Sequence, residues 1–246
     1  AAAVALAVFA IAGLRMPPGA RLVWWALWGF QALTFVGEAV YDAQHTDDDP
    51  LRIPPLASIL YLSAYVAVFL ALAVLIRSAH PGRDREAWID AAIMAIAAAS
   101  IIGVIIIEPA MASLGDPGLH TLVALVYPLL DLGVLALMIW LLFGTVHLSP
   151  VLALLTGAFT FYLAADLLYE YRFVNGLTDR TWVWREAMYL AAVVLIAAAA
   201  TAPGAEDITR PASTPHRRAT PIRIAGLVAA VVLVPLMLTV AVWQDR

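Results

Sequence analysis

The sequence predicts an all-α, polytopic transmembrane bundle of about eight spans, and three observations lead to that fold class. Hydrophobic residues make up 63% of the 246 residues and charged residues only 13%, whereas soluble domains are roughly 45–50% apolar and about 25% charged. The mean hydropathy is +0.90. The apolar residues form continuous runs, such as 104–107 and 196–200, and these lack the strict alternation of a membrane β-strand. Helices satisfy the backbone groups of such runs in lipid.

Eight apolar stretches are long enough, or nearly so, to cross a hydrocarbon core of ~30 Å, which takes about 20 helical residues. In chain order the expected spans are 1–14, 21–43, 55–77, 87–108, 120–144, 150–171, 182–201 and 222–243. Residues that end helices separate most of them: Pro17-Pro18-Gly19, Asp49-Pro50 with Pro54-Pro55, Pro81-Gly82, Asp116-Pro117-Gly118, Ser149-Pro150 and Asn175-Gly176. The first stretch is short and starts at Ala1 without the features of a signal peptide. We therefore expect a piece of a longer protein.

The arginines predict the orientation of the bundle. Those assigned to cytoplasmic loops follow the first, third and seventh spans: Arg15, Arg21, Arg77, Arg83, Arg85, Arg210, Arg217, Arg218 and Arg223. The loop after the second span is mainly acidic and is placed outside. The loop after the sixth span disagrees, because it carries Arg172, Arg180 and Arg185 yet must face outward. We expect a multi-pass protein of a bacterial cytoplasmic membrane, with a flexible cytoplasmic loop at 201–221 and both ends of the sequence outside.

A repeat with an offset of 128 residues is also visible. Its paired elements are Glu38-x-x-Tyr41-Asp42 with Asp166-x-x-Tyr169-Glu170, Gly29 with Gly157, and Tyr61-Leu62 with Tyr189-Leu190. The alternative is that alanine-rich helices match by chance. A true repeat predicts two parallel four-helix units, at 1–110 and 120–246, within a single transmembrane domain that covers 1–246.

Eight polar residues are candidates for a ligand-sensing or polar-core site. Glu38, Tyr41 and Asp42 share one helix face, and Asp166, Tyr169 and Glu170 share another. Asp131 lies deep in its span, just after Tyr127 and a proline, and a carboxyl at that depth should face the bundle interior or a wet cavity. These side chains can line an outward-opening pocket for a cation, a proton or a small polar ligand. The alternative is that they only form hydrogen bonds between helices.

Several classes of chemistry are excluded or disfavoured. The chain has no cysteine, which excludes disulfides, iron–sulfur clusters and thiolate sites, and no lysine, which excludes a retinal Schiff base. The histidines fall in loops or at helix ends, so neither haem nor a metal is expected. No phosphate-binding loop or hydrolase motif occurs, so we expect no enzyme activity. The net charge of −4 gives no indication of a nucleic-acid partner.

Short motifs in a fixed order resemble a known family. They are Gly37-Glu38-Ala39-Val40-Tyr41, Pro55 with Tyr61-Leu62, Ile89-Asp90-Ala91, Glu108-Pro109, Tyr127-Pro128-Leu129-Leu130-Asp131 and Ala165-Asp166-Leu167-Leu168-Tyr169. Between about Arg21 and Ala200 the chain resembles the N-terminal multi-helix membrane region that precedes GGDEF and EAL domains in actinobacterial cyclic-di-GMP signalling proteins. Glu38 and Ser58 depart from that pattern, which has aspartate there. The resemblance implies a sensing region, an extra helix at each end and an output domain beyond Arg246.

The leading hypothesis is therefore a membrane-embedded sensory domain that regulates a cytoplasmic output domain. A ligand or membrane state read near Glu38, Asp131 and Asp166 would shift the packing of two four-helix units. A small-solute or proton-coupled transporter is one alternative, and a structural or accessory subunit of a membrane complex is another. The expected partners are the lipid bilayer and either a second copy of the chain or a larger membrane complex.

Overall fold

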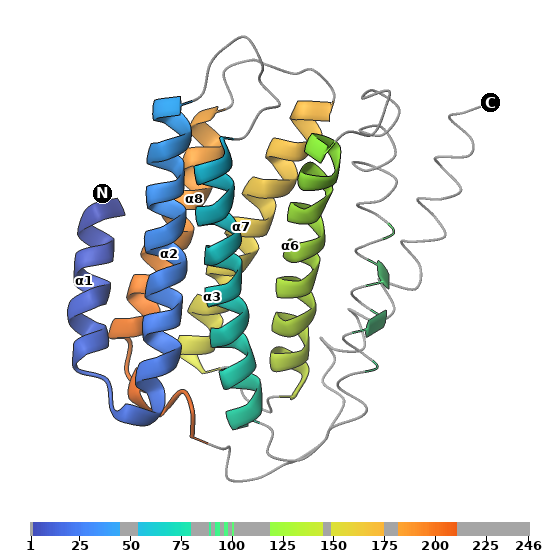
Figure 1. Cartoon of the computed structure of the whole chain (residues 1–246). Helices are drawn as coiled ribbons and strands as arrows, with labels where there is room; N and C mark the ends of the chain where they lie inside the picture. The colour runs from blue at the N-terminus through green and yellow to red at the C-terminus, as the bar shows by residue number, and fades with distance from the viewer. Residues whose placement is uncertain are drawn as a thin grey trace. The chain divides into compact units, whose positions relative to one another are not determined.

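The described residues of the computed structural model form an all-helical protein (Figure 1). The structure describes residues 2–44, 54–79, 119–144, 149–174 and 182–210, with isolated positions between 89 and 100. The helices are α1 (Ala2–Leu14), α2 (Pro18–Gln44), α3 (Pro55–Ala79), α6 (Leu119–Gly144), α7 (Pro150–Val174) and α8 (Trp182–Thr201), followed by the short 3-10 helix η2 (Ala205–Asp207).

Each expected span that falls on described residues is a helix, and its bounds lie within a few residues of those expected from the sequence. The expected spans at 87–108 and 222–243 lie outside the residues that the structure describes as continuous elements. The helical fold class is therefore confirmed for the described chain, whereas the number of about eight spans stays a prediction.

Prolines and a serine set where the helices begin. Pro18, Pro55 and Pro150 each occupy the first position of a helix, where a missing N–H costs nothing and the fixed φ angle suits the helix. Ser149 caps α7, because its Oγ accepts a hydrogen bond from the N–H of Leu152 at 3.1 Å. Helix α8 stops at Thr201, and Gly204 then takes a φ of 87°, a conformation that side chains disfavour.

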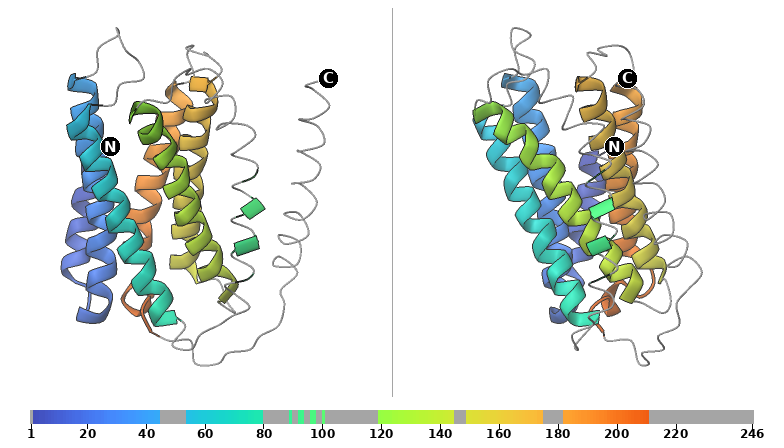
Figure 2. Two further views of the ribbon diagram at one scale, coloured as in Figure 1. Left: turned by 45° about the vertical axis from the view of Figure 1, so that its right-hand side comes forward. Right: turned by 90° about the vertical axis from the view of Figure 1, so that its right-hand side faces the viewer.

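The chain divides into two compact units. The first comprises Ala1–Ala79, Leu148–Tyr162 and Glu186–Pro211, and the second comprises His80–His147, Leu163–Arg185 and Ala212–Arg246. In the first unit α1 and α3 both pack against α2 (Figure 2). Its core contains Phe9, Trp24 and Leu27, each with an exposed fraction of 0%, and the rings of Phe9 and Trp24 meet edge to face at 5.9 Å.

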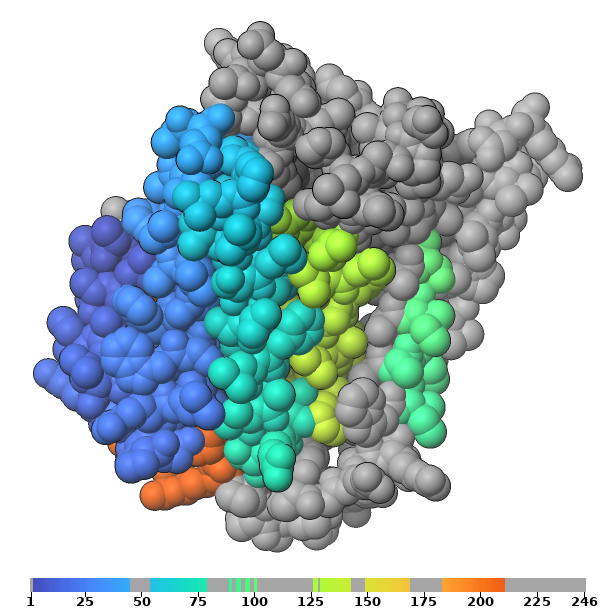
Figure 3. All heavy atoms as spheres, in the orientation of Figure 1, coloured from blue at the N-terminus to red at the C-terminus, as the bar shows by residue number. Residues whose placement is uncertain are grey.

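Helix α3 shows the surface expected of a helix in lipid. One face is buried and includes Ala64, Val68 and Leu72. The other face exposes large apolar side chains, namely Leu56, Ile59, Leu62, Val66 and Leu70. A soluble monomer rarely exposes an apolar stripe of this length, whereas acyl chains cover it in a membrane. Figure 3 shows this helix on the surface beside α2.

Three described helices are long and apolar enough to cross a membrane, consistent with a helical membrane protein: Pro55–Ser78, Pro150–Leu168 and Val183–Thr201. The apolar segments Ala2–Leu14 and Leu129–Leu142 are shorter. Helix α2 is long enough but carries Gln31, Thr34 and Glu38, which lower its mean hydropathy. Hydroxyl groups on the apolar helices bond back to carbonyls one turn earlier, as Ser63 does to Ile59 at 2.7 Å; hydrocarbon offers them no other partner.

The buried residues of the first unit recur at the offset of the proposed repeat. The pairs that are buried in both copies include Val23 and Val151, Leu27 and Leu155, Ala64 and Ala192, and Ala71 and Ala199. One contact recurs as well: a Cβ placed on Gly29 would lie 4.0 Å from Ala67, and a Cβ on Gly157 would lie 3.5 Å from Leu195. Residues 67 and 195 are also 128 positions apart. Thus α2 with α3, and α7 with α8, use the same register.

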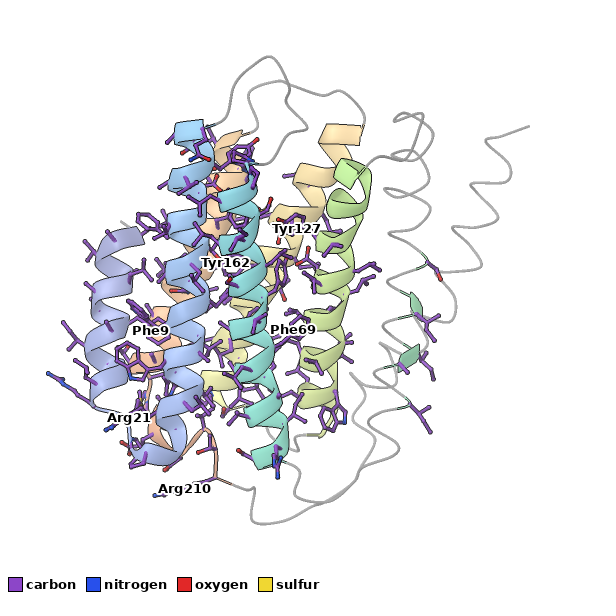
Figure 4. All side chains as sticks on the ribbon, viewed as in Figure 1. Phe9, Arg21, Phe69, Tyr127, Tyr162 and Arg210 are labelled. Carbon is purple, nitrogen blue, oxygen red and sulfur yellow. The ribbon has the colours of Figure 1, made fainter. Side chains whose placement is uncertain are left out.

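The segment after α8 folds back onto the start of α2. The buried indole N–H of Trp24 donates to the carbonyl of Ala205 at 3.0 Å, and Gly19 lies beside Thr209. Residues 202–210, the first half of the loop expected at 201–221, therefore have a defined conformation packed on α2. Figure 4 shows Arg21 and Arg210 at this end of the first unit. The remainder of that loop, 211–221, lies outside the described residues.

We predict that Trp24→Phe releases this segment. The variant keeps most of the ring volume but leaves the Ala205 carbonyl without its donor, which should cost about 1 kcal/mol. Hydrogen exchange of the amides between 205 and 210 should accelerate. Trp28→Phe is the matched control, because it removes an indole hydrogen bond of the same length to Leu6 on α1. Equal protection of 205–210 in wild type and Trp24→Phe would contradict the prediction.

Candidate functional site

The candidate site is built on one face of α2. Gln31, Thr34 and Glu38 are spaced by three and four residues, so they follow one another along the same side of the helix. Gln31 is 1% exposed, and Thr34 and Glu38 are partly buried. The Thr34 hydroxyl donates to the carbonyl of Phe30 at 2.8 Å and so bonds within its own helix. Gln31 and Glu38 bond instead to different neighbouring helices.

Glu38 bonds to α3. The hydroxyl of Tyr61 donates to Oε2 of Glu38 at 2.8 Å. Gly37 makes this approach possible, because a Cβ at that position would lie 2.8 Å from Cε1 and 3.0 Å from Cδ1 of Tyr61. The ring therefore lies against the bare backbone of α2, and its hydroxyl reaches the carboxyl group of the next residue. We call Gly37, Glu38 and Tyr61 the α2–α3 polar contact.

Gln31 lies about two helical turns from this contact and bonds to α8. Its Nε2 donates to the carbonyl of Val193 at 3.4 Å, which is long for a hydrogen bond. Its Oε1 is buried and has no hydrogen-bond partner among the described residues. A buried polar atom without a partner costs about 1–3 kcal/mol. The amide is thus a weakly satisfied polar group in the middle of an apolar core.

Aromatic rings from α2, α7 and α8 pack together next to Gln31 in the sequence of α2. Phe30 on α2 contacts Tyr162 of α7 edge to face, with ring centroids 5.0 Å apart. Tyr162 in turn lies 5.8 Å from Tyr189 of α8. Such pairs add about 0.5–1.5 kcal/mol beyond the area they bury. The rings therefore connect three helices at the depth where the polar face of α2 begins.

The structure places the other candidate residues as follows. Tyr41 is partly buried and Asp42 is exposed near the end of α2, one turn beyond Glu38. Tyr127 and Asp131 are four residues apart on α6, in the second unit, and are both partly buried. Asp166 is partly buried on α7 and also belongs to the second unit. Tyr169 and Glu170 are helical residues of α7 whose side chains lie outside the description.

Part of this arrangement was not predicted from the sequence. Tyr61 stood out there only as part of the repeat and of the family motifs, and Gln31 was not singled out. The available signals were an uncharged amide in the middle of an apolar helix and a glycine directly before the glutamate. The long-range partner of Glu38 had no local signal, because it lies 23 residues away on the next helix.

The site offers hydrogen-bonding chemistry. A carboxyl group, a phenol and an amide can bind a proton, a cation or a small polar molecule through hydrogen bonds. No group of three or more His, Cys, Asp or Glu side chains that could hold a metal occurs among the residues that the structure describes. No protein-family model, curated protein or solved structure matches the chain.

We predict that Gly37→Ala destabilises the protein and that Gly29→Ala does not. Alanine at 37 would push the Tyr61 ring away from α2, and such overpacking costs about 1–3 kcal/mol. Alanine at 29 meets Ala67 only at an ordinary 4.0 Å and gains helix propensity of up to ~1 kcal/mol. Thermal unfolding in detergent should therefore shift in opposite directions. A melting temperature that rises equally in both variants would show that Tyr61 does not lie against Gly37.

We also predict energetic coupling between Glu38 and Tyr61. A double-mutant cycle of Glu38→Ala and Tyr61→Phe should give about 0.6 kcal/mol and no more than about 1.7 kcal/mol, the range for hydrogen bonds between membrane helices. Reversible unfolding in mixed micelles gives the free energy of unfolding of the wild type, the two single variants and the double variant. Additive effects of the two substitutions would mean that the hydrogen bond contributes nothing to stability.

Proposed function

We propose that this chain is a membrane-embedded sensory domain that regulates a cytoplasmic output domain. The proposal includes about eight spans in a bacterial cytoplasmic membrane, arranged as two parallel four-helix units. By the resemblance described above, the output is cyclic-di-GMP turnover. The shared register of α2 with α3 and of α7 with α8 supports the repeat, and the three apolar spans support the membrane location.

The observation that carries the proposal is the set of polar contacts along α2. Near one end Glu38 bonds to Tyr61 of α3, and near the other end Trp24 bonds to Ala205 after α8. Fourteen residues of continuous helix, or about 21 Å at 1.5 Å per residue, connect the two contacts. A helix is stiff over this length. A displacement of α2 at Glu38 is therefore transmitted to the segment that follows α8.

The mechanism we propose uses two packing states of α2. In one state Tyr61 bonds to Glu38, as described above, and in the other a ligand, a cation or a proton takes the place of the phenol. The weakly satisfied amide of Gln31 favours such a switch, because little hydrogen-bond energy is lost when α2 moves along α8. A ligand shifts the balance only by the difference in its affinity for the two states.

Tyr61→Phe tests the proposal in the full-length protein. Removing a contact of about 0.6 kcal/mol from one state should change the basal output activity about threefold without any added ligand. Ser63→Ala is the matched control, because it also removes a hydroxyl from α3 but on the exposed face, where Ser63 bonds only to its own helix. Output activity in reconstituted vesicles, normalised to folded protein, is the measurement.

Equal activity of Tyr61→Phe, Ser63→Ala and wild type would overturn the proposed role of the α2–α3 polar contact. The encoding reading frame offers a second check. The sensory proposal requires a further helix and an output domain after Arg246, and a frame that stops within a few tens of residues would exclude it.

A small-solute or proton-coupled transporter is the second candidate. The repeated register of the two helix pairs favours it, because many transporters are built from internal repeats, and so does the carboxyl of Asp131 within α6. Transport predicts flux into vesicles that contain only this chain, lost on Asp131→Asn while the protein stays folded. The sensory domain alone gives no flux for any solute tried.

A further inference from the structure

We propose that the turn between α1 and α2 binds the headgroup of an anionic glycerophospholipid. The site consists of Arg15 and Arg21 at the membrane surface, with Trp25 and the exposed apolar residues of α1 and α2 beneath them. It requires only that the chain lies in a membrane. It therefore holds whether the chain senses, transports or assembles with other subunits.

The charge of this turn is one-sided. Arg15 and Arg21 are the only charged residues in the first 37 positions, which contain no acid. Among the described residues of the neighbouring segment, Asp207 pairs with Arg210 at 2.9 Å. With that pair neutralised, the exposed Glu206 is the one remaining acid of the segment, and it faces the two positive charges of Arg15 and Arg21. The local excess of positive charge favours a phosphodiester.

Arg21 is held in place for such a contact. Its Nε and Nη2 atoms donate to the carbonyl of Met16 at 3.3 and 3.1 Å, so the guanidinium folds over the turn, and the residue as a whole is exposed. The side chain of Arg15 is exposed and makes no hydrogen bond or ion pair within the described part of the chain. Guanidinium groups bind phosphate through paired N–H donors, and little side-chain entropy remains to be lost at Arg21.

The surface next to the arginines suits the rest of a lipid. Arg21 and Trp25 are four residues apart on α2, and the Trp25 indole lies against Gly13 of α1, where a Cβ would meet the indole Cε2 at an ordinary 3.8 Å. Trp25 and Trp28 meet edge to face at 5.4 Å. Indoles at this depth prefer the lipid interface. Leu14 directly precedes Arg15, and Leu22 directly follows Arg21. The two leucines are 66% and 50% exposed and offer apolar contact to an acyl chain.

This combination distinguishes a lipid from a soluble phosphate compound. A free anion would use only the two arginines and would leave the adjacent exposed leucines uncovered. A phospholipid covers both parts at once, and its headgroup is held at the surface by the bilayer. We therefore assign the turn to an anionic lipid such as phosphatidylglycerol.

Tryptophan quenching tests the assignment on the purified chain. The chain is reconstituted into phosphatidylcholine vesicles that contain a small fraction of phosphatidylglycerol. In one preparation the phosphatidylglycerol is brominated near the glycerol end of its acyl chains, and in a second preparation the phosphatidylcholine is brominated instead. The two quenching values compare the contact of the tryptophans with each lipid. We expect the anionic lipid to be preferred, by about fivefold for each arginine. Arg15→Gln should lower this preference about fivefold without affecting folding, because the Arg15 side chain makes no contact that the fold depends on. The Arg15→Gln/Arg21→Gln variant should remove the preference.

Arg77→Gln is the control, because Arg77 is exposed in the last turn of α3 and should leave the preference nearly unchanged. Trp25→Phe should reduce the quenching by the anionic lipid more than quenching by phosphatidylcholine. Inorganic phosphate should not displace the lipid. Equal quenching by the two lipids in wild type, or an unchanged preference in Arg15→Gln, would overturn the assignment. Displacement by inorganic phosphate would show a simple anion site instead.

Discussion

Polar groups in hydrocarbon need partners within the protein, because no water is present to replace them. In the first unit this requirement falls on α2, which sends polar side chains to α1, to α3, to α8 and to the segment after α8. Trp28 bonds to α1, Glu38 to α3, Gln31 to α8 and Trp24 to Ala205. The surrounding apolar contacts give little direction, since lipid tails are as apolar as leucine. Three short bonds, together with the longer one from Gln31, therefore help to fix the position of α2.

The helices could be predicted from the sequence because their signals are local. Apolar runs of membrane length, with Pro18, Pro55 and Pro150 at the first helical positions, mark α2, α3 and α7 to within a few residues. The offset between the halves was also visible, and it coincides with the contacts of Gly29 and Gly157. The folded turn at 202–210 could not be predicted in this way. Its conformation depends on Trp24, which lies 181 residues away from Ala205.

The candidate site was predicted only in part. Glu38 was recognised because a carboxyl group interrupts an apolar helix, and that is a property of one residue and its neighbours. Tyr61 and Gly37 acquire their roles from the distance between two helices. A glycine or a tyrosine in an apolar run can equally well serve ordinary helix packing, so the residue type alone does not mark a site.

The common register of the two helix pairs has a consequence for how this protein can change. One inserted or deleted residue turns every following side chain of a helix by about 100°, so a single such event within α2 would move Leu27 or Glu38 out of its place. The positions that match between 23–72 and 151–200 all share the offset of 128 residues, so no gap is needed between the first and the second helix of each pair. The paired positions nevertheless carry different side chains in places, with Phe159 opposite Gln31 and Leu152 opposite Trp24. Insertions and deletions within these helices are thus strongly constrained, whereas substitutions that keep the helical phase are tolerated.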